Sequence, residues 1–192
     1  MPVRPRQHAA LAELISILSM GEDTAAATFA SLAADHAPAA YDMTAISREE
    51  EGHAALVHAI LKDFPSRRDD PPFRRAQRLF FLELGRSDVP ARFSTIYALD
   101  SAVCVILSAA RRSHAVAREL HLAATLKQIH RDEARHVRVS RDWARQLSCS
   151  EDMRSRIHLT RHGLIDLLRR REDDLAEIGL DVDDLFGRLR PA

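Results

Sequence analysis

The chain reads Ile-Ser-Arg-Glu-Glu-Glu-Gly-His at residues 46–53 and Ile-His-Arg-Asp-Glu-Ala-Arg-His at residues 129–136. Each stretch contains one Glu-x-x-His pair. A spacing of three residues places both side chains on the same face of a helix. One such pair would be weak evidence for a site, because pairs of this spacing on exposed helices usually face solvent. Two pairs in one chain favour a shared role.

The residues around both pairs indicate that the pairs point into a core. Apolar and ligand-type side chains follow one another by mostly three or four residues along two lines: Ile46, Glu50, His53, Val57, Ile60, and Leu126, Ile129, Glu133, His136, Trp143. This is the apolar stripe of an amphipathic helix. Burying an ionised carboxylate without a partner costs several kcal/mol or more, so the pairs require a metal, a counter-charge or hydrogen bonds.

Two further acids lie alone inside apolar stripes. Glu22 stands between Leu18 and Phe29, and Asp100 stands between Tyr97 and Val103. The separation from Glu22 to Glu50 is 28 residues and that from Asp100 to Glu133 is 33. Each path is long enough to ascend one helix and descend the next to the same height. The pattern therefore predicts that four carboxylates and two imidazoles meet at one level.

The rest of the chain is predicted to be helical, with one domain over residues 1–192. We expect a first hairpin from helices at about 8–36 and from Pro38 to before Pro65, and a long connection from Lys62 to Pro90 with a short helix at 73–84. A turn near residues 113–116 should separate a third and a fourth helix, which completes a bundle core at about 8–148. A fifth helix is expected at about 151–178, with a solvated charge run at 169–174 and frayed last residues.

Composition supports an all-α fold. Apolar residues make up 46% of the chain, aromatic residues only 5%, and Gly only 6 positions, while Ala and Leu are strong helix formers. Lys plus Arg and Asp plus Glu balance at 28 each, so no overall field favours nucleic acid or a membrane. Two cysteines without a Cys-x-x-Cys spacing fit a reducing cytoplasm, and we expect no signal peptide and no membrane anchor.

Taken together, these residues resemble the ferritin-like diiron-carboxylate superfamily, in which two helices each supply one acid and two others each supply a Glu-x-x-His pair. The resemblance spans roughly Glu22 to His136 and implies a ferritin-like four-helix bundle with an additional C-terminal helix. It implies that Glu22 and His53 bind one metal, Asp100 and His136 the other, and that Glu50 and Glu133 bridge them. Asp100 departs from the more frequent Glu.

The resemblance also implies roles for two neighbouring residues. Asp132 matches the acid that often precedes the second Glu, and it would orient a ligand imidazole. Tyr97 lies one turn from Asp100 and is a candidate redox or proton-relay residue, although a core tyrosine is the alternative. His130 could be an extra ligand, but we expect an ordinary helix histidine.

Carboxylate-rich sites with one imidazole per metal suit iron, with manganese or a mixed pair as the alternatives. We therefore expect a cytoplasmic oxidoreductase with two metal ions that uses O2 to oxidise a small organic substrate. Such an enzyme would need an external electron donor. A homodimer is one possible assembly of the chain.

Three other functions stay open at this point. The first is iron oxidation, storage or peroxide removal, although Cys-x-x-Cys pairs are lacking and Glu51 stands where bacterioferritins place a haem-ligating Met. The second is a tRNA-modifying hydroxylase that uses Arg67, Arg68, Arg74 and Arg75 in the connection, which the balanced net charge disfavours. The third is a metal-free helical interaction module. The oxygenase hypothesis, by contrast, predicts an apolar pocket beside the metals. Its expected lining residues are Ala25, Ala26, Phe29, Tyr97, Val103, Cys104 and Ile129.

Overall fold

The computed structural model describes residues 4–64 and 70–191, and this part of the chain contains helices and no strands. The prediction of an all-α fold is confirmed. Four helices are long: α1 (Pro5–Asp35), α2 (Ala40–Leu61), α4 (Val89–Ala110) and α6 (Leu120–Leu147). The Arg67 and Arg68 positions of the tRNA hypothesis lie outside the described residues, while Arg74 and Arg75 lie on the connecting helix α3 (Pro71–Leu84).

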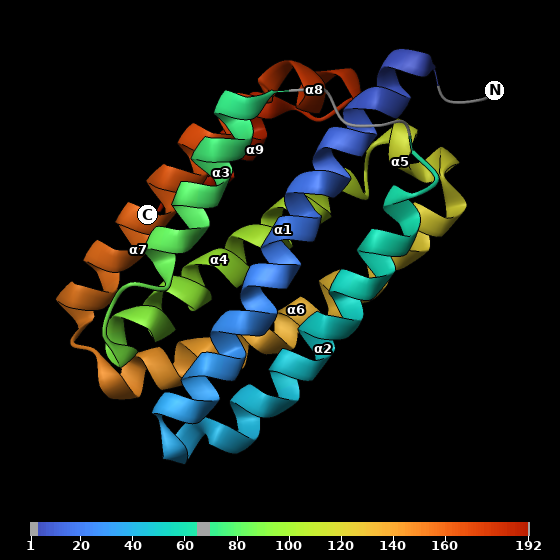
Figure 1. Ribbon diagram of the computed structural model, residues 1–192. Coiled ribbons are helices and arrows are strands. Elements are labelled where there is room, and N and C mark those ends of the chain that lie inside the picture. Colours follow the sequence, from blue (N-terminus) through green and yellow to red (C-terminus); the bar gives the residue numbers. More distant parts are fainter. Residues whose placement is uncertain (1–3, 65–69, 192) are drawn as a thin grey trace.

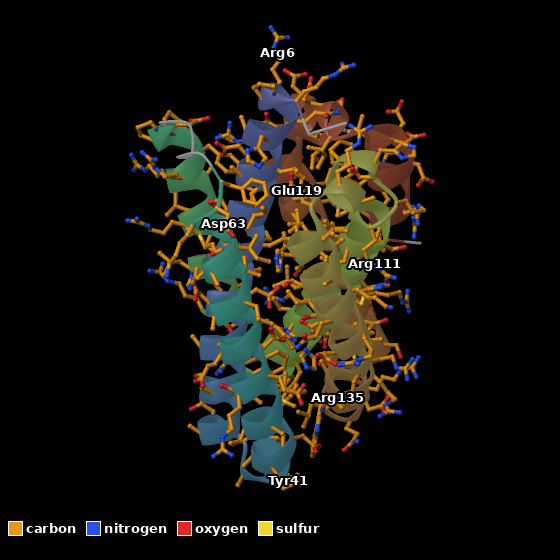
Figure 2. The ribbon with its side chains drawn as sticks, turned by 90° about the vertical axis from the view of Figure 1, so that its right-hand side faces the viewer. Arg6, Tyr41, Asp63, Arg111, Glu119 and Arg135 are labelled. Atoms are coloured by element: carbon orange, nitrogen blue, oxygen red, sulfur yellow. The ribbon has the colours of Figure 1, made fainter. Side chains whose placement is uncertain are left out.

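The four long helices form two hairpins that pack against each other (Figure 1). A short 3-10 turn, Ala37–Ala39, joins α1 to α2, and the two helices pack along each other. In the second hairpin α4 packs along α6. The hairpins meet where α2 contacts α6 and α1 contacts α4. In Figure 2 Arg6, near the start of α1, lies at the top and Tyr41, near the start of α2, lies at the bottom. Asp63, just past the end of α2, lies in the upper half, so α1 and α2 run antiparallel.

The reversal between α4 and α6 lies close to the predicted turn. The break runs from Arg111 to Glu119 and contains a short helix, α5 (His114–Arg118), so Val116 is helical rather than part of a turn. Ser113 starts α5 because its side-chain oxygen accepts hydrogen bonds from the backbone N–H groups of Ala115 and Val116. Its hydroxyl also donates to the carbonyl of Ile178, which ties this turn to the C-terminal part of the chain.

The predicted fifth helix is wrong in its length. It is α7 (Ser150–Arg169), and the chain then turns into α8 (Glu172–Glu177) because the N–H groups of Arg170 and Arg171 bond to carbonyls only three residues back. The charge run at 169–174 is not wholly solvated either, since Arg171 and Asp174 are buried. This turn packs against α1, which accounts for their burial.

The C-terminal residues are ordered, which corrects the prediction that they fray. Gly179 has a φ of +85°, a left-handed conformation that glycine adopts without steric cost. The chain reverses there and forms α9 (Val182–Leu189), which buries Leu185, Phe186 and Leu189. Both α7 and α9 pack on α4, and α3 packs on α7. Thus α3, α7 and α9 lie together on one side of the hairpins (Figure 1).

Apolar side chains form two core clusters at different heights of the bundle. One gathers around Leu18, Val57, Leu107 and Ile129, and the other around Phe29, Ile46, Phe93 and Ala144. Within the described chain, α4 alone is long and apolar enough to cross a membrane, but 61% of its most apolar window is buried against other helices, as in a core helix. The six predicted ligands, the residues Glu22, Glu50, His53, Asp100, Glu133 and His136, lie between these two clusters along their helices.

Candidate metal centre

Four helices each contribute ligand-type side chains to one buried layer. Glu22 comes from α1, Glu50 and His53 from α2, Asp100 from α4, and Glu133 and His136 from α6, and none of the six is more than 4% exposed. Ligand atoms of Glu22, Glu50, His53 and Glu133 all lie within 4.8 Å of one another. A buried cluster of Glu and His that could hold a metal ion is therefore present in this helical protein.

The two imidazoles point their Nδ1 atoms at the carboxylates. His53 Nδ1 lies 3.3 Å from Glu22 Oε2, 3.4 Å from Glu50 Oε2 and 3.9 Å from Glu133 Oε1. His136 Nδ1 lies 2.7 Å from Glu50 Oε1 and 3.6 Å from Glu133 Oε1. Glu50 and Glu133 thus each contact both histidines, and their predicted role as metal bridges stays a prediction.

Asp100 belongs to the same layer but is held differently. Its Oδ2 atom lies 3.1 Å from the hydroxyl of Ser140, which is buried on α6. Asp100 lines one cavity together with Glu22, Glu50 and Glu133. It is absent from the tight group of four ligand atoms, which agrees with the shorter reach of Asp. The structure therefore places all six predicted ligands in one layer.

Two acids on the outer side of the layer contact the imidazoles. The arrangement is crossed, because each acid contacts the histidine of the other helix. Asp132 on α6 places Oδ2 3.4 Å from Nε2 of His53 on α2, and Glu49 on α2 places Oε2 2.9 Å from Nε2 of His136 on α6. A proton on Nε2 leaves the Nδ1 lone pair free to bind a cation. Glu49 was missed by the sequence analysis, although it precedes Glu50 as Asp132 precedes Glu133.

The arginines near this site contact the two outer acids, Glu49 and Asp132. Arg135 contacts Glu49, and Arg131 lies 3.2 Å from Asp132 Oδ1. Arg135 lies on the side of the molecule where α2 and α6 run side by side (Figure 2). Across the part of the chain that the structure describes, no Lys or Arg forms an ion pair with Glu22, Glu50, Asp100 or Glu133. The metal-free alternative of an arginine-neutralised network is not seen there.

The close packing of four carboxylates and two histidines shifts the pKa values of these groups. Burial, together with the charges of the neighbouring carboxylates, raises the pKa of Glu22 and of Asp100 well above the usual range and that of Glu133 to about 7. Against the effect of burial, the two adjacent imidazoles lower the pKa of Glu50 to about 2. The carboxylates also overcome burial at the histidines and raise the pKa of His53 to about 10 and of His136 to about 11. The cluster thus attracts positive charge.

Three buried atoms of the cluster also lack a hydrogen bond of normal geometry: Glu22 Oε2, Glu50 Oε1 and His136 Nδ1. Their ion-pair partners lie close, with Glu50 Oε1 2.7 Å from His136 Nδ1 and Glu22 Oε2 3.3 Å from His53 Nδ1, so these contacts are electrostatic without good hydrogen-bond geometry. All three atoms are ligand types for a hard or borderline cation. The donor set therefore fits a metal ion, and the identity and number of ions are matters for proposal.

A cavity opens on the same carboxylates, with mainly aliphatic walls from α1, α3, α4 and α7. Of the predicted lining residues, Ala25 and Val103 are found there. The prediction is wrong for the other five, which do not line this cavity: Ala26, Phe29, Tyr97, Cys104 and Ile129. Phe29 and Ile129 are instead fully buried in the two core clusters, since α3 rather than α6 closes the cavity.

Two more predicted residues can be placed. Tyr97 is half-buried on α4, away from the cavity wall, and its relay role stays a prediction. His130 lies on α6 with Nδ1 2.6 Å from Arg111, outside the layer of ligands, as expected of an ordinary helix histidine.

The chain matches no protein-family model, and no curated protein or solved structure is significantly similar to it. Its function must be inferred from the site itself.

Proposed function

We propose that this chain is a ferritin-like protein whose four carboxylates and two histidines hold two metal ions, iron in the first place, and that it oxidises a small organic molecule with O2. Two iron ions would supply the redox equivalents that O2 requires. The chain supplies the ligands, the crossed acids that orient both imidazoles, and a cavity from which water is largely excluded. The observation that carries the proposal is this apolar cavity, which ends on the carboxylates.

The cavity favours substrate oxidation over iron storage. A ferroxidase must lead hydrated ferrous ions to its site along polar groups, whereas this cavity is walled by side chains such as Ile17, Leu99 and Leu164. An apolar pocket with a few convergent polar groups is instead typical of a site for a small organic ligand. Iron storage is therefore the alternative that the experiment must separate.

The proposal is tested first by metal content. After anaerobic loading with Fe(II), the wild-type chain should retain about two ions, because six ligands supply a dinuclear site. The double variant Glu50→Gln, Glu133→Gln should retain almost none, since it removes both carboxylates that contact both histidines. The matched control Glu51→Gln, Asp142→Asn alters exposed acids of the same two helices and should bind as the wild type does. One ion or fewer in a folded wild-type chain would contradict the proposal.

The second step separates oxidation of a substrate from storage. The diferrous protein is mixed with O2 and then with repeated additions of Fe(II), and O2 uptake is followed with an electrode. We expect uptake to stop after the bound ions have reacted and to resume only with a reductant and an organic substrate. Sustained oxidation of tens of ferrous ions per chain with mineral formation would establish the storage function instead.

A further inference from the structure

The walls of the cavity beside the carboxylates restrict what can enter it. Four helices contribute apolar side chains to its lining, among them Ile17, Leu18, Phe81, Leu84, Leu99 and Leu164. Gly21 on α1 leaves room there, since a Cβ atom at this position would be 3.9 Å from the Phe81 ring. A ligand in this cavity therefore contacts hydrocarbon on most sides.

The charges around the cavity disfavour an ionised ligand. The described lining residues include no Lys, Arg or His, and their only ionisable groups are the four carboxylates. They offer no positive charge to an anion. Two divalent cations would cancel the four negative charges, so a cationic ligand would then lack a counter-ion. Burying either kind of charge against aliphatic walls is costly, and a neutral ligand is favoured.

The cavity also limits the size of its ligand. Its volume of about 60 Å³ is four to six times the roughly 10–15 Å³ that one water molecule needs on the same measure. A molecule of about four to six non-hydrogen atoms therefore fits without rearrangement of the walls. Larger molecules would have to displace α3, which closes one side.

One hydroxyl on the cavity wall has no hydrogen-bond partner. Thr24 and Thr28 also line the cavity, but each donates its hydroxyl to the backbone carbonyl four residues earlier, at 2.7 Å and 2.8 Å. Thr95 on α4 is 3% exposed, and its Oγ1 atom is buried and unpaired. A buried unpaired hydroxyl costs about 1–3 kcal/mol, which a ligand that accepts its hydrogen bond would recover.

We propose that the cavity binds a small neutral aliphatic molecule, of about four to six non-hydrogen atoms, with one oxygen that accepts a hydrogen bond from Thr95. The inference deepens the proposed function by naming the substrate class, and it depends on that function only for the oxidation of the bound molecule. Binding itself depends on the cavity and can be measured without metal.

The test uses the metal-free full chain with its isoleucine δ1 methyl groups labelled with ¹³C. Three probes within this size limit are titrated: 1-pentanol, n-pentane and butanoate. We expect 1-pentanol to shift the methyl signals of Ile17, Ile96 and Ile106, which line the cavity, in a saturable way. Ile178, buried in the core away from the cavity, should not respond. Butanoate should bind at least about tenfold more weakly than 1-pentanol because its charge would be buried against aliphatic walls.

Two variants locate the ligand and its polar group. Gly21→Leu fills the cavity while it improves the helix propensity of α1, and it should abolish the shifts from both neutral probes. Thr95→Val keeps the shape of the side chain and should weaken 1-pentanol about fivefold without weakening n-pentane. The matched control Thr28→Val removes a hydroxyl from the same cavity that is already paired, and it should leave the affinity for 1-pentanol unchanged.

Four results would overturn the inference: butanoate binding as tightly as 1-pentanol, an equal response at Ile178, undiminished binding to Gly21→Leu, or equal effects of Thr95→Val and Thr28→Val. Repeating the titration with redox-inert Zn(II) present separates this inference from the proposed function. If the chain takes up no metal but still binds 1-pentanol, the proposed function fails and the ligand class stands. If it binds metal but not 1-pentanol, only the ligand class fails.

Discussion

Two buried clusters of charged side chains lie in this protein, and they differ in how their charge is balanced. In one, Arg171 lies 2.9 Å from Asp70, 3.6 Å from Glu13 and 3.9 Å from Asp174, with its guanidinium 4.1 Å from the centre of the Phe73 ring. In the other, Glu22, Glu50 and Glu133 pair with histidines and Asp100 accepts a hydrogen bond from Ser140, and within the described chain no Arg or Lys pairs with these four carboxylates.

The difference separates a structural cluster from a binding site. The Arg171 cluster contains a guanidinium, which keeps its positive charge and joins α1, α8 and the start of α3. In the metal layer the four carboxylates pair with no Arg or Lys within the described chain, and the cations beside them are two imidazoles, which must lose their protons before they bind a metal. Three ligand atoms of this layer lack a normal hydrogen bond. A permanent cation fits a structural cluster, whereas carboxylates beside imidazoles alone fit the proposed metal site.

The largest expected effect comes from the cluster with its own cation. Arg171→Met should cost about 3–5 kcal/mol of unfolding free energy, because it removes the guanidinium that faces the buried carboxylates of Glu13 and Asp174. Urea unfolding of the metal-free protein measures this. Metal affinity, compared in the same variant while it is folded, should stay as in the wild type. A loss below about 1 kcal/mol would show that the Arg171 cluster is not the structural one.

Bound metal should raise the unfolding free energy of the protein by a similar amount, which depends on the free metal concentration. At a free metal concentration 100 times the dissociation constant, binding to the folded state adds about 2.7 kcal/mol. Thermal unfolding with and without a chelator should show this gain, and the Glu50→Gln, Glu133→Gln variant should lose it. Equal melting temperatures with and without bound metal would count against a site that forms only on folding.

The metal-free protein should lose stability as the pH rises from 7 to 9. The pKa values of His53 and His136, about 10 and about 11 in the fold, exceed the ordinary value of 6.5, so the folded state binds more protons over this range. Their stabilisation is complete below pH 6.5 and is lost as the pH rises through the folded values. The groups that face them are Glu22, Glu50, Glu133, Asp132 and Glu49.

We expect a fall of about 2–5 kcal/mol over these two pH units, because each histidine that stays protonated only in the fold contributes up to about 1.4 kcal/mol per unit, measured by urea unfolding at each pH. Bound metal should suppress the fall, because it takes the place of the protons. A metal-free protein that becomes more stable from pH 7 to pH 9 would contradict the charge balance described for the layer.

The smallest effects are expected from the crossed acids. Asp132→Asn and Glu49→Gln should each lower metal affinity about tenfold, or about 1.4 kcal/mol, since each removes a carboxylate that orients the imidazole of the opposite hairpin. Competition with a colorimetric chelator gives the affinities. Glu51→Gln is the control next to Glu49. If the control weakens binding as much as Glu49→Gln does, loss of surface charge rather than imidazole orientation is the cause.

Much of the metal layer could be predicted from local spacing. Glu50 with His53 and Glu133 with His136 lie on apolar helical stripes, and such stripes face a core whatever the rest of the chain does. Glu49 was within reach of the same reasoning, because the two motifs match at that position. Ser140 was not, since only the packing of α6 against α4 brings its hydroxyl to Asp100, 40 residues earlier.

The Arg171 cluster shows where local reasoning stops. A run of six charged residues at 169–174 normally lies in solvent, and nothing in its sequence distinguishes Arg171 from Arg170. The turn after α7 directs Arg171 onto Phe73 and Glu13, which are about 100 and 160 residues away in the chain. Local reasoning also missed the part that α3 plays in the cavity. Phe81 and Leu84 of α3 line the cavity wall, whereas the expected Tyr97, Cys104 and Ile129 do not.

By itself, then, the sequence determined the helical class, the faces that the helices bury and the six ligand-type side chains on those faces. Those properties depend on the helical period, which acts over a few neighbouring residues. The tertiary structure alone decided which acid reaches which imidazole, which charged cluster contains its own cation and which helix closes the cavity. Those outcomes depend on how helices far apart in the chain are rotated and pressed together, because a contact between two side chains requires both of their helices to be in place.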